Sequence, residues 1–208
     1  MGAVFPERLV TDRLRFRAAG PESIDHETLY EAYSGPGLER VMAHVPLEPY
    51  ETRREVLEFL ESVAEGRAEN RAATYAIYPR EGEDGAGELA GTTTLFVDWE
   101  CRRAGLAIVL RERFWGRGYS GERAGALLAV AFDRLDLEVV GVSCLPANEN
   151  SRRAISRYVE RYGGCYDGRH RNARTLDDEP VDLHRYSITR EQYREAEPAL
   201  ESVDDEAS

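Results

Sequence analysis

The sequence contains no lysine, so all 27 of its basic residues are arginines, and 39 aspartate and glutamate residues outnumber them. The formal net charge is −12. This charge excludes nucleic acid as the expected partner, since its phosphates would be repelled. A lysine-free, acidic composition resembles that of cytosolic proteins from extreme halophiles, in which dense salt screens the repulsion between like charges. An acidic protein from a GC-rich mesophile is the alternative.

Cysteine and histidine are also scarce. The three cysteines, Cys101, Cys144 and Cys165, are an odd number without CxxC spacing. That pattern argues against a disulfide framework and against structural zinc. The four histidines are scattered and form no metal-ligand pattern. We therefore expect no bound metal.

Long apolar runs are missing as well. No stretch of about 18 apolar residues is present, which excludes a membrane-spanning helix. The N-terminus lacks the basic flank and apolar run of a secretory signal. We therefore expect a cytoplasmic protein without a membrane partner. A length of 208 residues suits one domain, which we place at residues 1–193, followed by an acidic, flexible tail at 194–208.

The apolar pattern predicts strands and helices in alternation. Strands are predicted at residues 9–16, 74–78, 89–99, 104–110, 137–145, 166–174 and 181–188. Helices are predicted at residues 26–33, 52–64, 121–135 and 150–162. This order indicates a mixed α/β domain.

A glycine-rich turn lies between the buried strand at 104–110 and the alanine-rich helix that follows it. Glycines let the backbone turn tightly and let its N–H groups approach a ligand, and the helix N-terminus adds a partial positive charge. The pattern fits a pyrophosphate site, although a plain loop would also fit. It lacks the Gly-Lys-Ser/Thr of a Walker motif and the repeated βαβ units of a dinucleotide site. The turn consists of Gly116, Arg117, Gly118, Tyr119, Ser120 and Gly121.

This strand, turn and helix resemble motif A of the GNAT acetyltransferases, Gln/Arg-x-x-Gly-x-Gly/Ala. Gly118 takes the consensus glycine, Ser120 takes the small last position, and Trp115 replaces Gln/Arg. Within that superfamily the sequence is most similar to the RimJ/RimL type, the ribosomal-protein N-acetyltransferases.

Four segments carry the RimJ/RimL likeness, in the right order between residues 8 and 193. Residues 11–17 (TDRLRFR) resemble T-x-R-L-x-L-R, and residues 115–122 (WGRGYSGE) resemble W-G-K-G-Y-A-T-E. Residues 148–153 (NENSRR) resemble N-x-x-S-x-R, and residues 182–193 resemble the closing D-x-x-x-Y-S-L-T-x-E-x-Y strand. Four spaced matches are far more specific than any one of them.

The resemblance implies the GNAT fold, with a mixed central sheet of about six to seven strands and helices on both faces, and acetyl-CoA as co-substrate. The turn amides would hold the pyrophosphate, Asn148 would hydrogen-bond the pantetheine, and Ser151 would lie near the thioester sulfur. From the residues alone, other roles are also consistent with the sequence. Asn148 could be a turn residue, and Ser151 could be a helix N-cap. Arg117 could contact a coenzyme A phosphate or be a solvated turn residue. The backbone groups implied to pair with the pantetheine arm are those of Ile108, Val109 and Leu110.

Acetyl transfer needs a base or water for the amine proton, an N–H donor for the thioester oxygen and a proton donor for the leaving thiolate. Many family members have a tyrosine seven residues after the asparagine, where this chain has Ile155. Ser151 is our preferred acid. Tyr158, one helical turn beyond Ile155, is a second candidate, with a packed aromatic as the alternative.

Two acidic residues at a strand end, Asp98 and Glu100, are candidate bases, because alternation points both side chains to one face. A solvated strand end is the alternative interpretation for both. For the thioester oxygen, a backbone N–H near Val109 is the expected donor.

The resemblance implies an N-acetyltransferase acting on a protein N-terminal α-amine, as a monomer or homodimer. A small amine or antibiotic is the alternative acceptor. Outside the enzyme class, an acyl-CoA-binding sensor and a partner-binding structural domain are the alternatives. We expect the acceptor groove between residues 43–50 and the last two strands.

Overall fold

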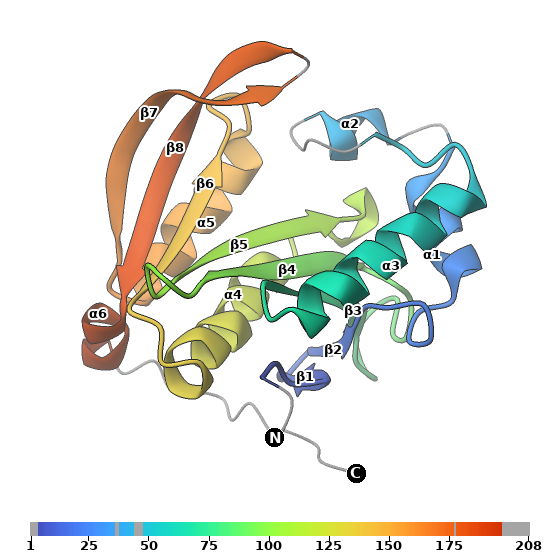
Figure 1. The fold of residues 1–208 in the computed structure, drawn as a ribbon, viewed down its shortest axis with the longest axis horizontal. Coiled ribbons are helices and arrows are strands. Elements are labelled where there is room, and N and C mark those ends of the chain that lie inside the picture. Colours follow the sequence, from blue (N-terminus) through green and yellow to red (C-terminus); the bar gives the residue numbers. More distant parts are fainter. Residues whose placement is uncertain (1–3, 36–37, 44–47, 177, 197–208) are drawn as a thin grey trace.

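One sheet organises the molecule. The computed structural model describes residues 4–35, 38–43, 48–176 and 178–196. Within them, eight strands follow the order β1-β2-β3-β4-β5-β6-β8-β7 (Figure 1). All neighbouring pairs are antiparallel except β5 and β6, so the sheet is mixed, as predicted. The strands are β1 (Arg8–Val10), β2 (Leu14–Ala18), β3 (Ala72–Pro79), β4 (Gly91–Asp98), β5 (Arg103–Leu110), β6 (Val139–Cys144), β7 (Cys165–Leu176) and β8 (Glu179–Thr189).

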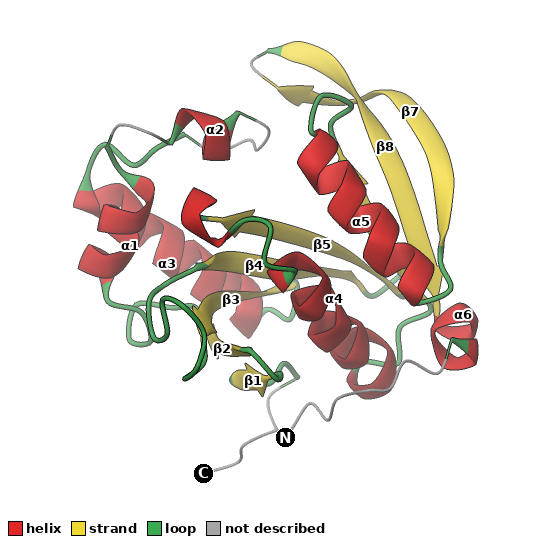
Figure 2. Ribbon diagram, turned by 180° about the vertical axis from the view of Figure 1, so that it is seen from behind, coloured by secondary structure: helices red, strands yellow, loops and turns green. Residues whose placement is uncertain are grey.

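Helices lie on both faces of this sheet, which confirms the predicted layering. Helices α1 and α3 lie on one face, and α4 and α5 lie side by side on the other (Figures 1 and 2). Each face has its own apolar cluster, because each helix pair turns one apolar side to the sheet. The helices are α1 (His26–Tyr33), α2 (Glu39–Met42), α3 (Arg53–Ala68), α4 (Tyr119–Ala129), α5 (Glu149–Arg161) and α6 (Arg190–Glu195), with a 3₁₀ turn at Glu112–Phe114 and a π-helical turn at Val130–Arg134.

The single strand predicted at residues 9–16 is wrong. The structure has two antiparallel strands there, β1 and β2, joined by a turn at residues 11–13. The Thr11 hydroxyl accepts a hydrogen bond from the Leu14 N–H (3.2 Å), and the Thr11 N–H donates to the Leu14 carbonyl (2.9 Å). Alternation of apolar residues continues through this turn, which is why the pattern concealed it.

Element ends differ from the prediction by a few residues elsewhere. Helix α4 begins at Tyr119, two residues before the expected start. Both last strands are longer than predicted, and the short helices α2 and α6 were not predicted. The tail predicted at 194–208 begins inside α6, and residues 197–208 lie outside the described residues.

The described part of the chain contains no helix that is long and apolar enough to cross a membrane. The same residues contain no cluster of three or more His, Cys, Asp or Glu side chains placed to bind a metal.

Candidate active site

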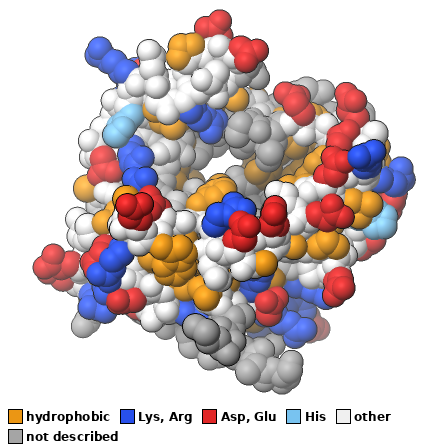
Figure 3. Space-filling view, viewed as in Figure 1, with side chains coloured by type: hydrophobic (Ala, Val, Ile, Leu, Met, Phe, Trp, Pro, Cys, Tyr) orange, Lys and Arg blue, Asp and Glu red, His pale blue; other side chains and the backbone are white. Residues whose placement is uncertain are grey.

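A cleft opens where β5 and β6 separate. These parallel strands pair only between residues 103–105 and 139–141, and β6 then continues against β8. Within the described residues, one edge of β5 therefore has no partner strand from residue 106 to 110. A cavity of about 1290 Å³ opens there, lined by the end of β5, the start of α4 and the length of α5. Figure 3 shows this face of the molecule hollowed near its centre.

Alternate peptide groups of β5 face this cleft. The Val109 carbonyl accepts a hydrogen bond from the Tyr33 hydroxyl (3.0 Å) and lies against Gly91 of β4. By alternation, Ile108 and Leu110 present their peptide groups to the open edge. The Leu110 carbonyl there accepts a bond from the Trp115 indole N–H (2.8 Å). This corrects the expectation for Val109, whose peptide groups point away from the cleft.

The glycine-rich turn forms the mouth of the cleft. Gly116 and Gly118 have φ angles of 77° and 82°, a left-handed conformation that favours glycine. Gly118 caps α4 without any side-chain hydrogen bond, and the first bonds back to its carbonyl come from Gly121 and Glu122. The amides at positions 119 and 120 precede those bonds, so they are placed to bind an anion.

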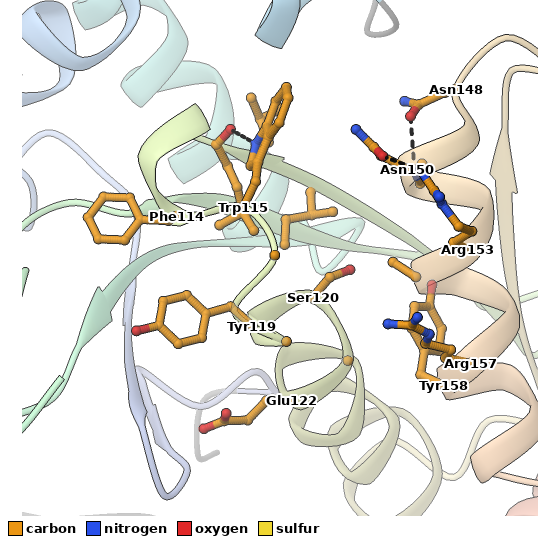
Figure 4. A pocket seen from close by; sticks show the side chains of 18 of the residues that line it. Phe114, Trp115, Tyr119, Ser120, Glu122, Asn148, Asn150, Arg153, Arg157 and Tyr158 are labelled. Atoms are coloured by element: carbon orange, nitrogen blue, oxygen red, sulfur yellow. Dashed lines mark hydrogen bonds between the residues drawn. The ribbon is translucent and has the colours of Figure 1, made fainter. Parts of the chain in front are cut away.

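The side chains of this turn diverge. Ser120 points across the cleft toward α5, whereas the Tyr119 ring points away from it (Figure 4). The Tyr119 hydroxyl donates to the Glu83 carboxylate (2.7 Å), and burial raises the pKa of Tyr119. Arg117 forms an ion pair with Asp84 (2.6 Å) and does not line the cavity. This surface position fits the solvated-turn alternative and not the phosphate contact.

Hydrogen bonds among Thr11, Arg13 and Glu122, which the sequence did not predict, hold the glycine-rich turn in place, and we call these three residues the buttress. The Glu122 carboxylate accepts hydrogen bonds from the Thr11 hydroxyl (2.6 Å) and from the Arg13 backbone N–H (2.8 Å). The Arg13 guanidinium also pairs with Glu122 (2.7 Å) and donates to the Arg117 carbonyl (2.9 Å). The sequence did offer one indication of these residues, because they lie in two of the four segments that match the RimJ/RimL pattern.

Asn148 and Ser151 lie at the first turn of α5. Asn148 is the N-cap, and its side-chain oxygen accepts the Ser151 backbone N–H (3.0 Å; Figure 4). The N-cap alternative considered for Ser151 is therefore wrong. The Asn148 amide nitrogen remains available as a donor. Both residues line the cavity.

One face of α5 carries three arginines at helical spacing. Arg153, Arg157 and Arg161 are four residues apart and all line the cavity. None of the three forms an ion pair with a carboxylate of the described residues, although the chain is strongly acidic. Arg153 donates to Asn150 at 2.8 Å (Figure 4). The row lies across the cleft from the glycine-rich turn.

Tyr158 is buried in the cavity wall. Its side chain is 2% exposed, and its hydroxyl oxygen is buried beside the Arg123 guanidinium. Burial raises the pKa of Tyr158 to about 12, and the nearby Arg123 guanidinium opposes that shift. Ile155 is buried in the apolar core beside it.

Glu100 lies far from the cleft. It belongs to the turn between β4 and β5, at the end of β5 opposite residues 108–110, about 20 Å away by strand rise. Asp98 in the same region accepts a hydrogen bond from the Cys101 N–H (3.0 Å) and pairs with Arg103 (3.1 Å). These contacts lower the pKa of Asp98. The structure thus removes both carboxylates as bases for chemistry in this cleft.

The expected acceptor groove is described only in part. Residues 44–47 lie outside the described residues. Arg40, Val41 and Ala43 line the end of the cavity nearest α2. Arg40 pairs with Glu112, and its guanidinium lies over the Trp115 ring.

Comparison with known proteins gives the family. The sequence profile of the acetyltransferase (GNAT) domain matches residues 13–158, more than half of the chain. The chain therefore belongs to the GNAT family, and it is an acetyl-CoA-dependent N-acetyltransferase. No curated protein gave a significant match.

Solved structures share this fold. An acetyltransferase named MccE, for microcin C7 self-immunity, in complex with acetyl-CoA and AMP, is 16% identical with a TM-score of 0.77, over 90% of this chain and 98% of that one. A candidate ribosomal-protein-serine acetyltransferase from Vibrio cholerae is 20% identical with a TM-score of 0.69, over 91% and 99%. Spermidine N-acetyltransferase from Vibrio cholerae, with CoA and spermine, is 17% identical with a TM-score of 0.67, over 87% and 98%.

Proposed function

We propose that this acetyltransferase acts on the N-terminal α-amine of a protein, as the RimJ/RimL-like segments imply. The observation that carries the proposal is the cleft itself. It runs from the three α5 arginines to the end nearest α2. An extended chain end entering beside α2 would reach the open edge of β5 while acetyl-CoA occupies the side next to α4 and α5.

The residues of the cleft fit acetyl-CoA group by group. The amides at positions 119 and 120 suit the pyrophosphate, and the arginine row suits the phosphates generally. The exposed peptide groups of Ile108 and Leu110 suit an extended pantetheine arm, which would hydrogen-bond like an added strand. The Asn148 amide is placed to donate to the same arm.

Ser151, which lines the cavity, supplies the candidate proton donor to the departing thiolate, and its hydroxyl has no hydrogen-bond partner among the described residues. The hydroxyl oxygen of Tyr158, the second candidate, is buried. With Asp98 and Glu100 remote, the amine proton passes to solvent water in the open cleft. Positioning the amine against the thioester supplies much of the acceleration.

The function is tested by titration followed by turnover. Calorimetry at high salt measures acetyl-CoA binding. Thiol release is then followed with a peptide bearing a free N-terminal serine, with the same peptide N-acetylated, and with spermidine. Release with the free peptide alone supports the proposal. Release with spermidine alone identifies a small-amine enzyme, and binding without release identifies a sensor.

Asn148 should contribute separately to the stability of α5 and to the binding of acetyl-CoA. Asn148→Ala removes the cap and the donor, so we expect a loss of about 1 kcal/mol in unfolding free energy and weaker acetyl-CoA binding. Asn148→Ser keeps a capping oxygen, so it should restore stability while binding stays weak. Denaturation and calorimetry check the two effects. Full recovery of binding in the serine variant would show that the amide makes no ligand contact.

A further inference from the structure

The face of the sheet opposite α4 and α5 is open beside the cleft. Alternate residues of β5 and β6 pack in the apolar cluster beneath α4 and α5, so the residues between them point to the other face. On that face α3 packs against β3, and β4 and β5 lie uncovered between α3 and the β7–β8 hairpin (Figure 1). The residues of β5 and β6 that point there are small, namely Gly105, Ala107, Gly141 and Ser143.

Two paired glycines form the floor of a trough on this open face. Gly105 pairs with Gly141 at the last position before β5 and β6 separate. On one side, Phe96 pairs with Gly105 and is 51% exposed. On the other side, the Arg185 guanidinium of β8 lies over Gly141, where an added Cβ would be 3.3 Å from Nη2 and 3.9 Å from Cζ. We call these four residues the trough.

The Arg185 guanidinium has no carboxylate partner within the described part of the chain. Arg103, which points to the same face, does pair with a carboxylate, that of Asp98 (3.1 Å). On the strand next to β8, the Asp167 carboxylate accepts a hydrogen bond from the Ser187 hydroxyl (2.7 Å) instead. In a chain with a net charge of −12, a partly buried guanidinium without an internal partner is suited to bind an anionic group of a ligand.

The trough meets the cleft where the acetyl group is expected. With the pyrophosphate at the amides of positions 119 and 120, the pantetheine arm passes Leu110 and then Ile108 on its way along β5 toward Gly105. Its acyl end therefore approaches the point where β5 and β6 join. Because α4 and α5 cover the cofactor side (Figure 2), the acceptor amine reaches the thioester from the open face, across the trough.

We propose that Arg185 is a specificity-determining residue that binds a carboxylate of the acceptor, so that the enzyme prefers protein N-termini with Asp or Glu close to the α-amine. The proposal rests on the proposed function. Gly141 lies one strand spacing, about 4.8 Å, from β5, so the carboxylate belongs to a residue near the first. A guanidinium and a carboxylate form two parallel hydrogen bonds, whereas a polyamine offers no anion to Arg185.

Three peptides with a free N-terminal serine test the preference. They differ only at the second and third residues, which are two glutamates, two glutamines or two lysines. Thiol release from acetyl-CoA gives kcat/KM for each peptide. We expect wild-type protein to use the glutamate peptide about tenfold better than the glutamine peptide, as one charge-assisted contact allows. Arg185→Met should lower the glutamate value about tenfold and leave the glutamine value, the Tm and the calorimetric Kd for acetyl-CoA unchanged.

Two further variants separate the charge from its position. Arg185→Glu should reverse the order, so that the lysine peptide becomes the preferred acceptor. Gly141→Ala keeps the charge but displaces the guanidinium from the floor of the trough, so part of the preference should be lost. Arg17→Met is the control, because it makes the same charge change at an exposed position of β2, with three strands between β2 and β6. It should keep the full preference.

The outcomes distinguish this proposal from the proposed function. Equal use of the glutamate and glutamine peptides by wild-type protein would overturn the role of Arg185 while leaving N-terminal acetylation intact. So would a preference that survives Arg185→Met, or an equal loss with all three peptides, which would indicate a general structural role. Release with spermidine but with none of the peptides would refute the proposed function itself.

Discussion

Glu122→Ala is expected to lower the free energy of unfolding by about 2–3 kcal/mol. The carboxylate is 10% exposed and accepts bonds from Thr11 and Arg13 that join the β1–β2 turn to the start of α4. Removing it leaves a hydroxyl, a backbone N–H and a guanidinium without their acceptor. The loss stays below that of a fully buried pair because the Arg13 side chain is 40% exposed. Urea denaturation measures the change.

The same substitution should also weaken acetyl-CoA binding. Arg13 links Glu122 to the Arg117 carbonyl (2.9 Å), so loss of the carboxylate frees the glycine-rich turn. We expect Kd to rise about tenfold, or about 1.4 kcal/mol. Glu122→Gln is the matched control, because it keeps an acceptor oxygen and should retain part of both properties. An unchanged Kd in the alanine variant would show that the turn holds its shape without the buttress.

Replacing Arg153, Arg157 and Arg161 together by methionine is expected to weaken acetyl-CoA binding roughly 10- to 100-fold at low salt. Each exposed charge contact is worth up to about 1 kcal/mol. The three arginines line one side of the cavity, and none of them has a carboxylate partner within the described part of the chain. Methionine keeps the helix propensity and the apolar part of the side chain. Calorimetry at two salt concentrations measures the effect.

Salt and a second ligand make this prediction specific. The difference in acetyl-CoA affinity between the wild type and the triple variant should be smaller at high salt, because screening weakens exposed charge contacts. If the row binds the 3′-phosphate, dephospho-CoA should lose less affinity than acetyl-CoA on the same substitutions. Equal losses would instead assign the row to the pyrophosphate. A triple variant that binds like wild type at low salt would exclude the arginines from the site.

The matched motifs contain functional residues, but the motifs alone did not show what those residues do. Thr11 and Arg13 each lie more than 100 residues from Glu122 in the sequence, and their two segments were treated as separate signatures. They form one buttress because β2 pairs with β3 and α4 packs beneath that part of the sheet. Alternation in residues 9–16 also hid the turn that places Thr11 and Arg13 within reach of the carboxylate.

The alternation of apolar and polar residues gave the wrong candidates for the base. It correctly predicted a strand that ends near Asp98, but it contains no information about the distance of that strand end from the cleft. The hairpin between β4 and β5 pairs Asp98 with Arg103, which places both at the end remote from residues 108–110. Arg123 was not singled out for the opposite reason. An arginine in an alanine-rich helix looks solvated until the packing of α5 covers it.

The sequence by itself determined the layering, the position of the glycine-rich turn and the family, because apolar periodicity, glycine spacing and the four matched segments each involve only a few neighbouring residues. Only the tertiary structure decided which groups share the cleft. The separation of β5 from β6 exposes the peptide groups of Ile108 and Leu110, and the packing of α5 against α4 buries Tyr158 with Arg123. The glycine-rich turn is held by contacts that span over 100 residues. Such contacts depend on strand order and helix packing, which no local pattern specifies.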